Sequence, residues 1–135
     1  MLKFESGNYY YGQFKKGSMH GFGDFVWSSG KSFSGYYVKD LKEGLGLFYW
    51  NDPVEIYFGY WLKGYKNGPA IQITSQGKYY SYWENGKQTK LFANKKEGIV
   101  FLQNSNNINK RYRKFFCLKL EILVKLYTQK KNYGY

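Results

Sequence analysis

A pattern of aromatic residues around a glycine recurs along this chain, and this repetition limits the possible folds more than any other feature. The centres of the pattern follow one another in steps of 23, 24 and 22 residues and lie at Gly12, Gly35, Gly59 and Ser81. A second short motif follows each of the first three centres, at residues 20–23, 43–46 and 67–70. A fixed period of this length is typical of repeat proteins, in which each unit is one supersecondary element stacked on its neighbours.

Each repeated unit has the features of a β-hairpin. Turn-forming residues close the units at 28–31, 51–53 and 75–78, and the changes in step fall there, where a loop tolerates insertion. Aromatic residues make up 23% of the chain, which contains 16 glycines. Aromatic rings suit a pleated sheet, and glycine permits tight turns. We therefore predict a mainly β fold, an elongated single-layer antiparallel meander of hairpins.

The first copy, residues 10–23, resembles the MORN (membrane occupation and recognition nexus) repeat, whose pattern is roughly Y-x-G-x-W/F-x-x-G-x-x-H/N-G-x-G. The second copy departs from it at Asp40 and Glu43, the third at Ala70, and the fourth fades after Gly86. The resemblance covers about residues 2–90, which we assign to an array of about three and a half repeats. It implies a non-catalytic module that acts in cytoskeletal, ciliary or membrane-proximal assemblies.

The rings and glycines of the repeats are predicted to share one face, because successive side chains of a strand point to opposite faces. Glycine is unfavourable within a strand, so its recurrence predicts close approach of a ring or of backbone. These rings are the only core available to a single-layer sheet, but no second sheet covers them, and large uncovered apolar patches mark partner sites. The predicted partner-binding face consists of Tyr10, Phe14, Phe25, Trp27, Phe33, Tyr37, Phe48, Trp50, Tyr57 and Trp61.

Lysines also recur in register. One repeat position holds Lys16, Lys39 and Lys63, and another holds Lys42 and Lys66. Equivalent residues in successive hairpins lie about 10 Å apart, so the sequence predicts a ladder of lysines along one edge. We favour a solvated edge that deters aggregation over an anionic-lipid surface, because Asp40 and Glu43 weaken the ladder.

The rest of the chain is more basic than the repeats. Residues 1–90 carry eleven Lys/Arg against seven Asp/Glu, whereas residues 91–135 carry ten against two. We predict a strand and linker over 91–107, with the strand at 98–102, and a basic amphipathic segment over 108–131. The apolar periodicity of that segment fits both a helix and a strand. Its length and its Leu, Lys and Glu content favour a helix.

The basic segment has several candidate roles. It can pack on the repeats and cover the aromatic face, bind a calmodulin-like partner, or lie on a membrane. No recognised nucleic-acid motif accompanies its charge, so nucleic acid is not an expected partner. The candidate lipid-binding residues are Lys16, Lys39, Lys63, Lys110, Arg111, Arg113 and Lys114.

Several classes of site are disfavoured by the composition. The chain has one cysteine, Cys117, and one histidine, His20, so it offers neither a disulfide nor a thiolate or multi-histidine metal site. We assign His20 to a turn. The carboxylates of the chain are scattered along the sequence, so we name no catalytic residue and expect no cofactor. The sequence shows neither a signal peptide nor an apolar run of membrane-spanning length, which predicts a cytoplasmic protein, with cytoskeletal or membrane association.

Three functions are therefore weighed. The first is a scaffold that binds a protein partner through the aromatic face. The second is a peripheral membrane module that binds anionic phospholipid through the basic segment and the edge lysines. The third is a regulatory repeat fragment of a larger enzyme. Open sheet edges also permit an edge-to-edge homodimer.

Overall fold

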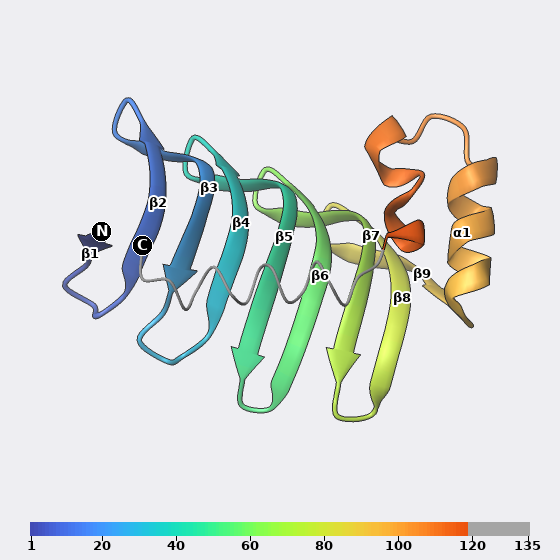
Figure 1. The fold of residues 1–135 in the computed structure, drawn as a ribbon, viewed down its shortest axis with the longest axis horizontal. Helices are drawn as coiled ribbons and strands as arrows, with labels where there is room; N and C mark the ends of the chain where they lie inside the picture. The colour runs from blue at the N-terminus through green and yellow to red at the C-terminus, as the bar shows by residue number, and fades with distance from the viewer. Residues whose placement is uncertain (119–135) are drawn as a thin grey trace.

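Nine antiparallel strands follow one another in chain order across a single open sheet, so each strand pairs only with its neighbours in the sequence. The computed structural model describes residues 1–118. Figure 1 shows the strands side by side along the long axis of the molecule, as the repeats predict. The strands are β1 (Leu2–Lys3), β2 (Tyr9–Lys15), β3 (Ser18–Val26), β4 (Ser32–Val38), β5 (Leu41–Asn51), β6 (Val54–Leu62), β7 (Tyr65–Thr74), β8 (Gly77–Glu84) and β9 (Lys87–Phe92).

Two kinds of turn connect the strands, one along each long edge of the sheet (Figure 1). The turns after β2, β4, β6 and β8 have two residues with positive φ, as at Lys16 (φ 50°) and Gly17 (φ 82°). Two successive positive φ values define a type I′ turn, whose twist matches that of the strands it joins. The other edge carries the loops at 27–31, 52–53 and 75–76, close to the turns predicted from the sequence.

A bulge in the strand after each of the first three turns explains one glycine of the second motif. Between β2 and β3, the single residue Gln13 lies opposite the segment 20–22, and Gly21 there has a φ of 85°. Gly44 and Gly68 occupy the same place with φ values of 100° and 106°. All three glycines are needed for a left-handed backbone, and of the three Gly68 alone also lies under a ring, that of Tyr112, which corrects part of the expectation from the sequence.

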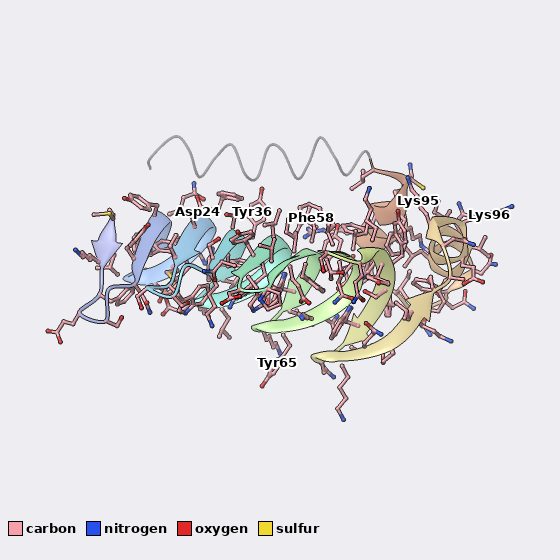
Figure 2. All side chains as sticks on the ribbon, turned by 90° about the horizontal axis from the view of Figure 1, so that it is seen from below. Asp24, Tyr36, Phe58, Tyr65, Lys95 and Lys96 are labelled. Carbon is pink, nitrogen blue, oxygen red and sulfur yellow. The ribbon has the colours of Figure 1, made fainter. Side chains whose placement is uncertain are left out.

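The two faces of the sheet carry separate apolar clusters. One cluster lies on the predicted aromatic face and includes Tyr10, Phe33 and Trp61. The other lies on the opposite face over β5–β8, where Phe58 packs with residues from the segment after β9. Figure 2 shows Phe58 and Tyr36 pointing to the side on which the helical segments lie. The described part of the segment after β9 thus packs on the opposite face and not on the aromatic face, whose covering is one of the candidate roles of the basic segment.

The strand predicted at 98–102 is wrong, because residues Lys95–Asn104 form helix α1. The Asn94 side chain accepts a hydrogen bond from Glu97 N–H at 3.0 Å, and the Glu97 carboxylate accepts one from Ala93 N–H at 2.8 Å. This reciprocal pair satisfies two free N–H groups where the helix begins, much as in a capping box. Asn-x-x-Glu was the sequence signal for this helix, and it outweighs the strand propensity of Ile99 and Val100.

The basic segment predicted over 108–131 begins differently from the expected long helix. Its described part forms two 3₁₀ helices, η1 (Lys110–Tyr112) and η2 (Phe115–Cys117). Phe115 and Phe116 are buried against the sheet and α1, since their rings contact Phe58 at 5.9 Å and Tyr80 at 5.6 Å. The tight turn of η2 lets these two adjacent phenylalanines contact different strands. The predicted helix beyond residue 118 lies outside the described residues.

Candidate interaction face

The structure brings all ten residues of the predicted partner-binding face together. Their rings form one continuous network, with centroid distances from 4.1 Å between Phe48 and Trp50 to 6.2 Å between Phe33 and Phe48. Trp83 of β8 extends the network, 5.8 Å from Tyr57. We call these eleven residues the aromatic face. The sequence reasoning left out Trp83, although it occupies the same repeat position as Phe14, Tyr37 and Trp61.

The inner layer of the aromatic face consists of rings that lie on glycines. Tyr10 and Phe33 are fully buried. A Cβ atom at Gly35 would lie 2.8 Å from Phe33 Cζ, and one at Gly46 on the next strand would overlap the same ring. Tyr10 covers Gly12 and Gly23 in the same way. The glycines therefore form the floor on which these rings pack, as predicted.

The outer layer of the aromatic face is open to solvent in part. Trp27, Trp50 and Trp83 are half-buried, and Phe14 is 47% exposed. Trp27 lies 5.4 Å from Phe48, and Phe48 stacks on Trp50, so the outer rings rest on the inner ones. Since the chain has only four tryptophans and the fourth is Trp61, every tryptophan of the protein belongs to this face.

Two lysines extend across the aromatic face, which the sequence reasoning missed. Lys42 pairs with Tyr37 across β4 and β5, and Lys66 pairs with Trp61 across β6 and β7, so their side chains share the face of the rings. Lys42 Nζ lies 5.2 Å from the Phe33 ring and 5.5 Å from the Trp61 ring. These lysines are therefore not part of a solvated edge ladder. The placement of these lysines on the aromatic face could have been predicted from their pairing with aromatic positions on the neighbouring strand.

The Lys66 ammonium is held in a similar way. Lys66 Nζ lies 4.5 Å from the Trp83 ring, 4.8 Å from Tyr57 and 5.2 Å from Trp50. Cations over ring faces are attracted by the quadrupole of the π system. No carboxylate of the described residues forms a salt bridge with either lysine.

Burial lowers the pKa of both lysines from its ordinary value. The charge of Lys31, whose Nζ lies 5.0 Å from the Trp27 ring, lowers the pKa of Lys42 further. For Lys66 the opposite charge of Glu55 raises it in part. Lys31, Lys42, Lys66 and Glu55 thus give the aromatic face a positive balance at neutral pH.

Comparison with known families identifies the repeat. The model of the MORN repeat matches residues 10–32 and 33–52, which contain all but the first residue of β2 to β5 and eight of the eleven residues of the aromatic face. The chain is a MORN repeat protein. MORN repeats are generally modules of protein or membrane interaction, and the family is typically non-catalytic. A comparison with curated proteins finds no match.

One departure from the MORN pattern is compensated locally. Asp40 stands where a repeat has glycine, and it adopts a φ of 69° in its turn. Its carboxylate accepts a hydrogen bond from Met19 N–H at 2.7 Å, and its own N–H donates to Met19 O at 3.0 Å. The backbone bond recurs in the later MORN repeats, from Gly64 to Lys42 O and from Gly86 to Lys66 O. Each of these three turns is thus tied to the preceding hairpin.

The candidate lipid-binding residues fall into two groups. Lys16, Lys39 and Lys63 are exposed and hold the first position of the type I′ turns, in a row along one edge of the MORN array. In the basic segment, Lys110, Arg111 and Lys114 are exposed. The Arg113 guanidinium instead donates to Leu102 O, Gln103 O and Ser105 O, at 3.2 to 3.4 Å, and so closes the end of helix α1.

Other sequence-based candidates have simple positions. His20 lies in the first bulge of the MORN array beside Gly21, not in the turn itself. No group of three or more His, Cys, Asp or Glu residues within residues 1–118 is arranged to hold a metal ion. No helix of the same part of the chain is long and apolar enough to cross a membrane.

Proposed function

We propose that this protein is a non-catalytic scaffolding module whose aromatic face binds a protein partner. The observation that supports this proposal is the placement of the segment after β9. Helix α1, η1 and η2 pack on the opposite face, whereas the cluster on the aromatic face is built, within residues 1–118, from sheet residues and Trp27. Tryptophan is one of the residues enriched at the energetic centre of protein interfaces.

The resemblance of the repeats to the MORN family suggests where such a scaffold acts. We assign it to cytoskeletal or membrane-proximal assemblies in the cytoplasm. The module contributes a rigid surface, because its glycines and inner rings are close-packed. A pre-formed surface loses little conformational entropy when a partner binds.

Affinity capture with paired variants tests this function. Trp50→Ala removes a half-buried ring of the aromatic face, and Tyr65→Ala removes a ring outside that cluster that is 61% exposed. We expect a partner that the wild-type protein and Tyr65→Ala retain equally and that Trp50→Ala loses. Circular dichroism of the three proteins checks that each is folded. A partner retained equally by Trp50→Ala would argue against this face.

The row of exposed lysines supports a second candidate function, contact with an anionic membrane. Lysines near such a surface contribute roughly 1 kcal/mol each, and this attraction is screened by salt. The triple replacement of Lys16, Lys39 and Lys63 by Asn tests it, since Asn85 holds the equivalent turn position in the fourth hairpin. We expect loss of co-sedimentation with anionic vesicles at low salt. Unchanged co-sedimentation would exclude these lysines as the lipid contact.

A further inference from the structure

Neither lysine of the aromatic face has a described carboxylate within salt-bridge distance, although the charge of Glu55 acts on Lys66 from farther away. Lys42 and Lys66 are partly buried among rings, and neither forms a salt bridge with a described carboxylate. The equivalent position of the first hairpin holds Met19, opposite Phe14, and that of the fourth holds Gln88, opposite Trp83. The fold therefore accepts an uncharged side chain at this position. The ammonium groups of Lys42 and Lys66 are thus not required by the architecture itself.

The spacing of the lysines sets the spacing of any anionic groups that would pair with them. Lys42 lies on β5 and Lys66 on β7, two strands apart. Adjacent strands are about 4.8 Å apart, so the two positions are separated by roughly 9.6 Å along the sheet. The outer rings Trp27 and Trp50 differ by the same single repeat. A ligand that crosses the strands therefore meets a cation and an indole ring with one common period.

A polyproline II segment has this period. It has three residues per turn and rises about 3.1 Å per residue, so residues three apart share a face and lie about 9.3 Å apart. A β-strand repeats each face every second residue, at about 6.7 Å, which does not match. An α-helix reaches about 10.5 Å only after seven residues, and so offers fewer contacts for its length. Proline rings also dock on aromatic grooves with little loss of entropy.

We propose that the aromatic face binds an acidic polyproline II segment of a protein partner, with a carboxylate at every third residue pairing with Lys42 and Lys66. This inference rests on the function proposed above and adds the chemistry of the partner. Lys31 increases the positive charge beside Lys42, whereas Glu55, paired with Trp50 across β5 and β6, opposes an anion near Lys66. The acid opposite Lys42 is therefore bound more strongly than the one opposite Lys66.

Tryptophan fluorescence of the full chain measures this binding, because all four tryptophans belong to the aromatic face. The probe is a synthetic peptide of repeated Pro-Pro-Glu, titrated at low and high salt. Three peptides serve as comparisons: Pro-Pro-Gln repeats of the same length, Pro-Glu repeats with the wrong spacing, and a helical peptide with glutamates seven residues apart. We expect saturable binding of Pro-Pro-Glu alone, weakened by salt.

Paired variants test the lysines. Lys42→Met with Lys66→Met copies the residue found at Met19 and removes both ammonium groups. Lys39→Asn with Lys63→Asn removes the same charge at the turns and copies Asn85. We expect the first pair to weaken peptide binding by at least roughly tenfold, since hydrogen bonds to charged groups are among the stronger ones. The second pair should stay within about twofold of wild type, and Glu55→Gln should tighten binding.

Several results would overturn the inference. One is binding of Pro-Pro-Gln or Pro-Glu repeats as tight as that of Pro-Pro-Glu repeats, and another is tighter binding of the helical peptide. A third is an equal loss of peptide binding in the two lysine double variants. Anionic vesicles that change the fluorescence through Lys42 and Lys66, while the peptide does not, would assign the site to lipid instead. If Trp50→Ala still loses a captured partner but Pro-Pro-Glu repeats do not bind, this inference fails and the proposed function stands.

Discussion

Gly46 leaves no room for a methyl group, because the ring of Phe33 occupies that space. We expect Gly46→Ala to destabilise the protein by about 1 to 3 kcal/mol, the usual cost of forcing a buried ring to move. Phe33 lies 5.3 Å from Trp61, so the tryptophan fluorescence should shift as well. Urea unfolding followed by fluorescence measures both effects.

Gly17→Ala provides the control, because Gly17 has a φ of 82° but no atom near its Cβ direction. It should cost about 1 kcal/mol of backbone strain and leave the native fluorescence unchanged. Equal fluorescence changes in the two variants would contradict the description of Gly46 as the floor beneath Phe33.

Tyr10 links stability to alkaline pH. Burial, with smaller effects of Asp24 and Asp40, raises the pKa of Tyr10 to about 12. Between about pH 10 and pH 12 the unfolded chain therefore loses this proton while the folded chain keeps it, so stability falls as the pH rises through this range. The hydroxyl donates to Gln13 O at 2.9 Å.

Tyr10→Phe removes both the hydrogen bond and the ionisable group. It should lower the free energy of unfolding by about 1 kcal/mol at pH 7, and the difference from wild type should narrow or reverse above pH 10. Phe33 shows that the same repeat position accepts phenylalanine. Urea unfolding of both proteins at pH 7 and above pH 10 provides the measurement. A difference in the free energy of unfolding that widens at high pH would contradict a raised pKa of Tyr10.

Lys42 acts in the opposite direction. Burial lowers its pKa, so below about pH 10.4 the unfolded chain binds this proton more readily than the folded chain. Stability then rises with pH from the lowered pKa up to that of the unfolded chain. We expect wild type to gain stability relative to Lys42→Met between neutral pH and about pH 10. Both proteins have the same tyrosines, so the effect of tyrosine ionisation on stability cancels in this comparison. A constant difference across this range would exclude a lowered pKa.

At the scale of elements, the segment after β9 acts as a clamp on one end of the opposite face. Phe116 is fully buried, and its ring contacts Tyr80, Phe92 and Phe115. Phe116→Ala should cost about 3 to 5 kcal/mol of this packing. Hydrogen exchange in α1 should become faster, while exchange in β2–β5 stays close to wild type. Unchanged protection of α1 would show that Phe116 does not hold this segment in place.

The elements show where sequence reasoning reached its limit. The alternation of side chains along each strand was enough to place Tyr10, Phe33 and Trp61 on one face, because a ring that packs on a glycine must lie on the same face as that glycine. It did not reveal the bulge at Gly21, since a bulge of two extra residues leaves the alternation intact on either side. Helix α1 was missed because the cap at Asn94 and Glu97 decides its structure, and an apolar pattern does not contain that information.

At the scale of the molecule, the chain is a sheet with two different faces, and the repeat pattern predicted only one of them in full. The aromatic face follows from residues one repeat apart. The cover on the opposite face depends on contacts between residues distant in sequence, such as Phe58 with Phe115, which no periodicity signals. The repeated positions of Lys42 and Lys66 were visible in the sequence. The face of the sheet on which their side chains lie depends on the pairing of these lysines with Tyr37 and Trp61, which the sequence reasoning did not consider.

The central claim is that a partner covers the aromatic face, and quenching of tryptophan fluorescence tests it most directly. Trp27, Trp50, Trp61 and Trp83 are the only tryptophans and all belong to that face. A soluble quencher should reach the half-buried indoles of the free protein and lose access when a captured, tryptophan-free partner or segment is bound at saturation. Protection of the indoles is the predicted result. Unchanged quenching in the saturated complex would show that the partner binds elsewhere.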